Sequence, residues 1–268
     1  MVGVQVSKLF KCVVGGTATI SRSVSRRGWL WALVIGGVVV GQAAHAHGTH
    51  PADDCIQFNL KTPTKKVNPY PGSTTYYKEY HYSAGGINLK VTGWSYHNGK
   101  IIQDWVGLWD GLGVERTNSP NHAVDNHNGD YDMLLLCFDV PVALKSLQIG
   151  WVHNDSDVSL LALTGGTLSN FTGKVWQALL GEGWESAGDY YDVKQNPNVN
   201  PDKIFAECWL VGAYNPNLGG SWLGGNKNVT TGPDYFKLAG LCVIPEPTTV
   251  GMVGLAFCGL LPLLRRRR

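Results

Sequence analysis

Residues 87–108 read INLKVTGWSYHNGKIIQDWVGL. Ile87 to Tyr96 and Ile101 to Leu108 are rich in Val, Ile, Tyr and Trp, which favour extended strands. The pair Asn98-Gly99 between them favours the two-residue turn of a β-hairpin, because both residue types tolerate a positive φ. This stretch therefore predicts an antiparallel hairpin within an all-β domain.

Further segments of strand-like composition lie on both sides of this hairpin. They are Cys55 to Leu60, Thr75 to Tyr82, Met133 to Val140, Ser146 to His153, Val158 to Leu163, Ile204 to Tyr214 and Tyr235 to Val243. About nine strands in one domain favour a two-layer β-sandwich of jelly-roll-like form. Asn170 to Pro201 is rich in Gly, Asn and Pro, so we expect an irregular loop insertion there, with a helical turn or two at Lys174 to Leu180.

The N-terminal segment has the order of features found in secretory signal peptides. The apolar run Trp29 to Val40 follows Arg26-Arg27 and precedes Ala44-His45-Ala46. A basic region, a short apolar run and an A-x-A site in this order are typical of a cleaved export signal. We predict that residues 1–46 are a signal peptide read by the Sec translocon and that residues 47–244 form the exported domain.

The C-terminal segment, residues 245–268, begins with Pro245, Glu246 and Pro247. Thr248 to Leu264 follow without a charge and just reach the length of a membrane helix. Four basic residues then end the chain: Arg265, Arg266, Arg267 and Arg268. Because cytoplasmic flanks carry the excess of Lys and Arg, the exported domain is expected on the other side of the membrane.

This order of triplet, apolar helix and arginine cluster resembles the PEP-CTERM sorting signal that exosortases recognise in Gram-negative bacteria. The resemblance covers residues 245–268. It implies a transient stay in the inner membrane, cleavage near the triplet by an exosortase, and transfer to the cell surface or the extracellular matrix.

The centre of the chain is similar to the exosortase-dependent surface protein family. The segments that carry the similarity are Gly111 to Val114, Ser119 to Asn126, Asp130 to Asp132, Leu134 to Leu136, Ile149 to Trp151 and Asp155 to Ser159. The similarity spans roughly residues 85–215. It supports a surface location and implies no particular chemistry.

Charge and cysteine content limit the possible functions of the exported domain. Residues 47–244 have a net charge of −6 with His neutral and one arginine, Arg116, which argues against binding to nucleic acid. Four cysteines fall in this domain: Cys55, Cys137, Cys208 and Cys242. Their even number in an oxidising compartment predicts two disulfides, with three connectivities open. Their wide spacing argues against a zinc site.

Acidic and amide side chains crowd into one segment of the predicted domain. They are Asp125, Asn126, Asn128, Asp130 and Asp132, with Asp155 and Asp157 further along the chain. Such oxygen ligands suit Ca²⁺, although the spacing of an EF-hand loop is missing. The alternative is a turn in which these side chains satisfy neighbouring backbone groups without any ion.

Evidence for catalysis is weak in this sequence. Neither G-x-S-x-G nor H-E-x-x-H occurs, and the acidic pair Glu182 and Glu185 has no pattern that selects it. Cleavage after Ala46 would place His47 at the N-terminus, where its amine and ring would chelate copper as in lytic polysaccharide monooxygenases, but no second histidine is selected. We expect no enzyme.

The expected function is that of a structural or adhesive component of the cell surface or the exopolysaccharide matrix. A secreted carbohydrate-binding module is the alternative, because three tryptophans in Gly-rich segments would stack on sugars if exposed: Trp176, Trp184 and Trp222. A polysaccharide-active enzyme is a third and weaker hypothesis.

Overall fold

The computed structural model describes residues 55–115, 122–195, 197–219 and 232–247. The predicted signal peptide, the predicted membrane segment and Arg265 to Arg268 lie outside these residues, as do His47 and Trp222. None of the helices in the described ranges is long and apolar enough to cross a membrane.

Of the described residues, 58% are in strands and 6% are helical, which confirms the all-β class. Twelve strands form within the described ranges. They are β1 (Ile56–Asn59), β2 (Lys65–Pro69), β3 (Tyr76–Ala84), β4 (Ile87–His97), β5 (Lys100–Leu108), β6 (Leu112–Glu115), β7 (Val124–Asp125), β8 (Met133–Asn154), β9 (Val158–Leu163), β10 (Trp184–Tyr190), β11 (Ala206–Ala213) and β12 (Asp234–Pro245). One α-helical turn, α1 (Trp176–Leu179), and 3₁₀ turns at His127–Gly129 and Pro216–Leu218 accompany them.

The hairpin predicted at residues 87–108 is confirmed as β4 and β5. Tyr96 pairs with Ile101 and His97 pairs with Lys100, so Asn98 and Gly99 form the turn. Both turn residues have a positive φ, 49° at Asn98 and 79° at Gly99, as a type I′ hairpin turn requires.

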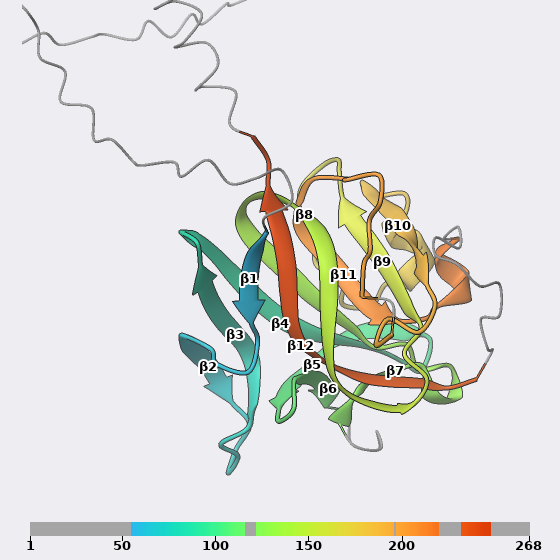
Figure 1. Ribbon diagram of the computed structural model, residues 1–268. Helices are drawn as coiled ribbons and strands as arrows, with labels where there is room; N and C mark the ends of the chain where they lie inside the picture. The colour runs from blue at the N-terminus through green and yellow to red at the C-terminus, as the bar shows by residue number, and fades with distance from the viewer. Residues whose placement is uncertain (1–54, 116–121, 196, 220–231, 248–268) are drawn as a thin grey trace, which may run out of the picture. The chain divides into compact units, whose positions relative to one another are not determined.

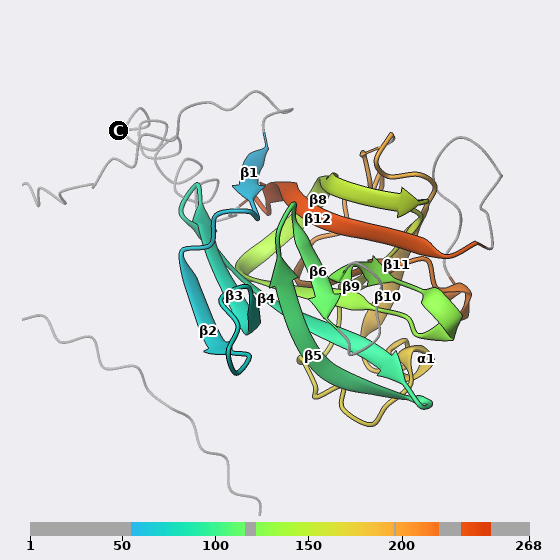
Figure 2. The ribbon, with the colours of Figure 1, turned by 90° about the horizontal axis from the view of Figure 1, so that it is seen from below.

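Strand β8 covers two segments that the sequence predicts as separate strands. Met133 to Val140 and Ser146 to His153 are the two halves of a single 22-residue strand that continues through Pro141. The first half pairs with β4 and β11, whereas the second half pairs with β12. Because the two halves have different partners, the strand passes from one group of strands to another (Figures 1 and 2).

The strands close into a barrel of six, which makes the predicted two-layer sandwich correct only in part. The ring runs β12, β6, β5, β3, β4 and β8, and the second half of β8 pairs with β12 again. Fully buried apolar side chains such as Leu112, Phe236 and Leu238 belong to the core that these strands share. Burial of this core is the main source of stability in such a domain.

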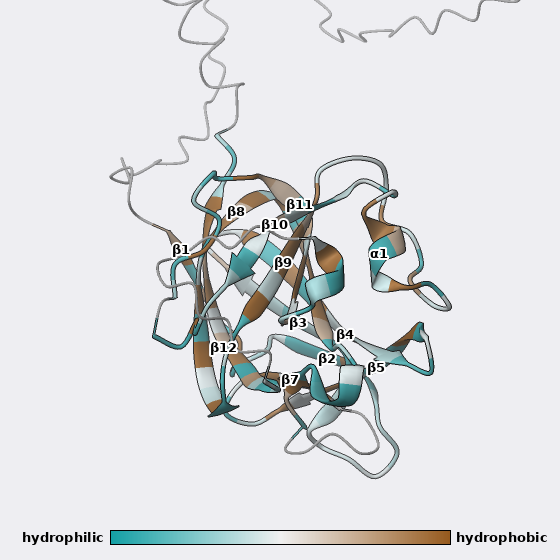
Figure 3. Ribbon diagram, turned by 90° about the vertical axis from the view of Figure 1, so that its right-hand side faces the viewer, coloured by the Kyte–Doolittle hydropathy of each residue, from teal (hydrophilic) through white to brown (hydrophobic). Residues whose placement is uncertain are grey.

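Strands β11, β9 and β10 extend the sheet from the first half of β8 and carry a second apolar cluster. The cluster joins α1 to β9 and β11, so α1 packs against this part of the sheet (Figure 3). The predicted irregular insertion is therefore partly regular, because Trp184–Tyr190 forms the edge strand β10. Trp176 and Trp184 are each only 1% exposed, which rules out their proposed stacking on sugars.

Cys55, Cys137, Cys208 and Cys242 form two disulfides, as the sequence predicts. Cys55 bonds to Cys242 with a Cα to Cα distance of 5.5 Å, and Cys137 bonds to Cys208 with 4.2 Å. The first disulfide joins β1 to β12 and the second joins β8 to β11.

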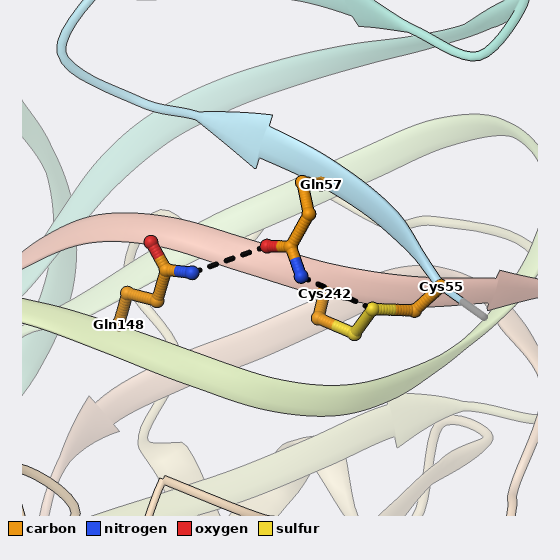
Figure 4. Close-up of a disulfide and its surroundings, with 4 residues drawn as sticks. All are labelled: Cys55, Gln57, Gln148 and Cys242. Atoms are coloured by element: carbon orange, nitrogen blue, oxygen red, sulfur yellow. Dashed lines mark hydrogen bonds between the residues drawn. A yellow bond between two sulfur atoms is a disulfide. The ribbon is translucent and has the colours of Figure 1, made fainter. Parts of the chain in front are cut away.

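The disulfide between β1 and β12 lies among exposed polar groups. Gln148 on β8 donates its side-chain amide to Oε1 of Gln57 at 3.1 Å, and Gln57 in turn donates to Sγ of Cys55 at 3.2 Å (Figure 4). These contacts cross β12, so the three strands β1, β12 and β8 are connected at this point.

Candidate metal centre

The loop between β8 and β9 meets the beginning of β12 at the edge of the barrel. Asn154 has a φ of 65°, which turns the chain at the end of β8. Asp155 then forms isolated bridges with His153 and with Asp234, and its carbonyl accepts the backbone N–H of Tyr235 at 3.2 Å. These backbone contacts hold Asp155 beside the first residue of β12.

Three carboxylates come together at this junction. Asp155, Asp157 and Asp234 each offer one oxygen, and the three oxygens lie within 4.8 Å of one another. Asp157 and Asp234 are 0% exposed, while Asp155 is partly exposed. Ca²⁺ binds oxygen at about 2.3 to 2.6 Å, so two ligand oxygens on opposite sides of one ion lie about 5 Å apart. One ion can therefore contact all three carboxylates.

Hydrogen bonds orient two of these carboxylates. Asp234 accepts the backbone N–H of Asp157 on Oδ1 at 3.1 Å and the side-chain amide of Asn126 on Oδ2 at 2.7 Å. Asn126 also accepts the backbone N–H of Asp234 at 2.7 Å, so the pair is reciprocal. Asp157 accepts the backbone N–H of Asp192 on Oδ1 at 2.8 Å.

The second carboxylate oxygen of Asp157, Oδ2, differs from the first in its hydrogen bonding. Oδ2 is buried, and no described group donates a hydrogen bond to it. A buried carboxylate oxygen without a donor is costly, because it loses its hydration and gains nothing in return.

The electrostatics of the junction disfavour negative charge. Burial, followed by the neighbouring carboxylates, raises the pKa of Asp157 to about 7 and that of Asp234 to about 8. The charged groups that act on these two pKa values are all acidic: Asp155, Asp157 and Asp192. Two responses relieve such a cluster, namely protonation of a carboxyl group or binding of a cation.

The seven residues that the sequence suggested for Ca²⁺ are placed in different surroundings. Asp155 and Asp157 belong to the carboxylate cluster, and Asn126 contacts it through Asp234. The cluster does not include Asp125, Asp130 or Asp132.

The segment from Asp125 to Asp132 forms a turn through its own backbone and side-chain contacts. Oδ1 of Asp125 accepts the backbone N–H of His127 at 3.0 Å, and the carbonyl of Asp125 accepts the N–H of Asp132 at 2.8 Å. Asp130 donates its N–H to the carbonyl of His127, and Asn128 is exposed with a φ of 54°. The alternative reading of this segment, a turn stabilised by local hydrogen bonds, fits these contacts.

Sequence reasoning missed Asp234. It lies far along the chain from Asp155 and Asp157, and only the antiparallel pairing of β12 with β8 and β7 brings it to them. Its place at the first position of a strand, after Gly232-Pro233, is a weak signal that applies to many turn residues.

A groove of about 460 Å³ adjoins the junction. Its lining residues are Asn126, His127, Asn128, Gly129, Tyr131, Tyr214, Pro216, Gly232 and Pro233. Nδ1 of His127 lies 2.7 Å from the hydroxyl of Tyr235, which fixes the imidazole ring at one wall. Asn126 connects the groove to the carboxylate cluster, because it lines the groove and hydrogen-bonds to Asp234.

Glu182 and Glu185, the acidic pair considered for catalysis, lie in the loop around α1 and on the edge strand β10. Glu182 accepts hydrogen bonds from Lys174 at 2.5 Å and from Ser169 at 2.7 Å, which ties together the loop around α1. Glu185 is exposed on the edge strand β10.

Comparison of the chain with protein-family models, with curated proteins and with solved structures finds no match.

Proposed function

We propose that this chain is an exported structural or adhesive component of the cell surface or extracellular matrix, sorted by an exosortase in a Gram-negative bacterium. The domain would be a jelly-roll-like relative of the β-sandwiches. The observation that carries the proposal is the pairing of all four cysteines of residues 47–244 in two disulfides. Such bonds form and persist in oxidising compartments outside the cytoplasm.

The end of the last strand adds support for a sorting step near the triplet. Pro245 ends β12, where it pairs with Val142, and Glu246 donates its N–H to the carbonyl of Pro141 at 3.0 Å. The triplet therefore begins at the last residue of β12. Cleavage after it would leave every strand of the domain in place.

Deletion of residues 248–268 tests this proposal and leaves the strands of the domain intact. The shortened chain should be secreted or periplasmic and should no longer reach the cell surface. Fractionation of the host, with mass spectrometry of both termini, would measure this. Substitution of Arg265 to Arg268 by Ser is the matched change, since it removes the charges and keeps the apolar segment. Surface protein that retains an intact tail would contradict the proposal.

A carbohydrate-binding role is a second candidate, favoured by the groove rather than by the tryptophans first considered. Tyr131, Tyr214 and His127 line it together with the amide side chains of Asn126 and Asn128. Aromatic rings that stack on sugar faces, beside a few polar groups that fix orientation, are common in ligand sites.

Glycan binding by Tyr131→Ala and Tyr214→Ala variants tests this second role. Trp109→Ala is the control, because Trp109 is 42% exposed and does not line the groove. Loss of binding in both tyrosine variants but not in the control would favour a carbohydrate-binding module. Equal glycan binding by all three variants would exclude the groove as the glycan-binding site.

A further inference from the structure

Three properties of the junction of β8, β9 and β12 indicate a site for a cation. The first is geometric: one oxygen from each of Asp155, Asp157 and Asp234 falls within 4.8 Å of the other two. The residues come from two separate parts of the chain, and backbone bridges hold those parts together.

The second observation is the unsatisfied oxygen of Asp157. The side chain is fully buried, its Oδ1 is satisfied by Asp192, and its Oδ2 lacks a donor. Buried polar atoms in folded proteins nearly always have a hydrogen-bond partner. An ionised carboxylate can only accept hydrogen bonds or bind a cation.

The third observation is the sign of the surrounding charge. Asp192 lies close enough to act on Asp157, and its Oδ1 accepts the hydroxyl of Ser156 at 3.0 Å. Neither Lys nor Arg is among the groups that shift the pKa of Asp157 or of Asp234. Within the described residues, the charged side chains that shift these two pKa values are all carboxylates, so negative charge accumulates at this junction.

The donor atoms select the kind of cation. The group contains only carboxylate oxygens and neither His nor Cys, which favours a hard ion over zinc or copper. Ca²⁺ tolerates irregular coordination and completes its shell with carbonyls and water, whereas Mg²⁺ demands a near-ideal octahedron. Asp155 is partly exposed, so water can reach the ion from that side.

We propose that Asp155, Asp157 and Asp234 bind one Ca²⁺ ion that ties the start of β9 to the start of β12. The ion supplies the partner that Oδ2 of Asp157 lacks and balances the three carboxylates. It also fixes Asp234, and through the reciprocal pair it fixes Asn126 at the wall of the groove. This site is independent of how the protein is sorted.

Calorimetric titration of the purified, chelator-treated full-length chain with CaCl₂ tests the proposal, alongside thermal unfolding with CaCl₂, with MgCl₂ and with EDTA. Binding to the folded state alone at a hundredfold excess over Kd shifts the folding equilibrium about a hundredfold toward the folded state. We expect one Ca²⁺ per chain, a higher Tm with Ca²⁺, reversal by EDTA and a smaller response to Mg²⁺.

Substitutions separate this site from the neighbouring turn. Asp157→Asn and Asp155→Asn should each weaken Ca²⁺ binding at least tenfold, whereas Asp130→Asn, the matched change outside the cluster, should leave it unchanged. Asp155 is partly exposed, so Asp155→Asn remains informative if Asp157→Asn fails to fold. No heat of binding with an unchanged Tm, or loss of binding in Asp130→Asn alone, would overturn the proposal.

Discussion

The two ends of strand β12 are held in different ways. At its C-terminal end Cys242 is bonded to Cys55, and the neighbouring Leu241 and Val243 are completely buried. At its N-terminal end Asp234 is also completely buried, but its neighbours are carboxylates and an amide. One strand thus begins at a buried, charged junction and ends at a disulfide, with a buried apolar residue on each side of Cys242.

The two ends of β12 should therefore lose stability under different conditions. The disulfide that joins β1 to β12 responds to redox conditions and hardly at all to pH or ions. Buried carboxylates depend on their protonation and on any cation that binds them. Changes of pH or of cation concentration should therefore affect the polar end of β12 while the disulfide end stays the same.

The largest expected effect comes from reduction of both disulfides. Each typically contributes about 2 to 4 kcal/mol, so complete reduction should lower the free energy of unfolding by about 4 to 8 kcal/mol. Urea unfolding with and without a phosphine reductant measures this loss. A Cys55→Ala, Cys242→Ala double variant isolates the end of β12 and should lose about 2 to 4 kcal/mol, equally with CaCl₂ or EDTA. An unchanged midpoint after reduction would contradict this account.

A pH effect of similar or smaller size is expected from Asp189 on β10, near the polar end of β12. Burial raises its pKa to about 6, and its Oδ1 accepts a hydrogen bond from Ser159 at 2.5 Å. The folded state therefore binds a proton more tightly than the unfolded state does. Its stabilising contribution is full below about pH 4 and is lost as the pH rises through about 6, a change of about 3 kcal/mol.

Asp189→Asn keeps the acceptor for Ser159 and removes the charge. The variant should match the wild type at pH 4 and be the more stable of the two at pH 7. Denaturant unfolding of both proteins at several pH values measures the difference. A constant difference across this range would show that Asp189 does not titrate as described.

The reciprocal hydrogen bonds between Asn126 and Asp234 should have an intermediate effect. Asn126→Ala leaves the buried Oδ2 and the N–H of Asp234 without these partners, at a cost of about 1 to 3 kcal/mol. Chemical unfolding measures this cost. Asn128→Gly is the matched control, because Asn128 lies in the same turn, is exposed and has a φ of 54° that Gly adopts freely, so this variant should change little. Equal losses in the two variants would contradict a specific role for Asn126.

The smallest effect is expected at the disulfide end. Gln148→Ala removes an exposed hydrogen bond to Gln57, for which about 0.5 kcal/mol or less is expected. Unfolding experiments on this variant sharpen the comparison, because a large loss would mean that the amide contacts, rather than the disulfide, hold β1 to β12.

Local signals in the sequence predicted the local parts of this fold. The hairpin β4–β5 follows from Asn98-Gly99 and the strands around it, because the turn geometry depends only on those residues. The sequence predicts two strands, Met133 to Val140 and Ser146 to His153, where the structure has the single strand β8, which continues through Pro141 as it changes partners. Closure of the barrel depends on this change of partners and has no local signature.

The candidate site shows the same limit. The abundance of Asp and Asn in two loops predicts an oxygen-rich site, and two of the residues it points to, Asp155 and Asp157, lie together with Asp234 in the structure. The turn from Asp125 to Asp132 has the same composition but satisfies its own backbone, so composition alone does not distinguish the two. Asp234 and the cysteine connectivity depend on which distant strands pair, which the sequence left open.

The position of the disulfide also determines how the domain carries a mechanical load. Strand β12 lies along β8 from Asp234 to Pro245, so a pull on Pro245 along the strand loads this ladder in shear instead of peeling it open. Cys242 lies near the pulled end and transfers part of the force to β1 through a covalent bond. Cys55 lies beside the pulled end of β12, so tension between Cys55 and Pro245 reaches the disulfide before it reaches most of the barrel. Forced unfolding depends on the barrier to unfolding, so this disulfide should raise the resistance of the domain to a pull between Cys55 and Pro245.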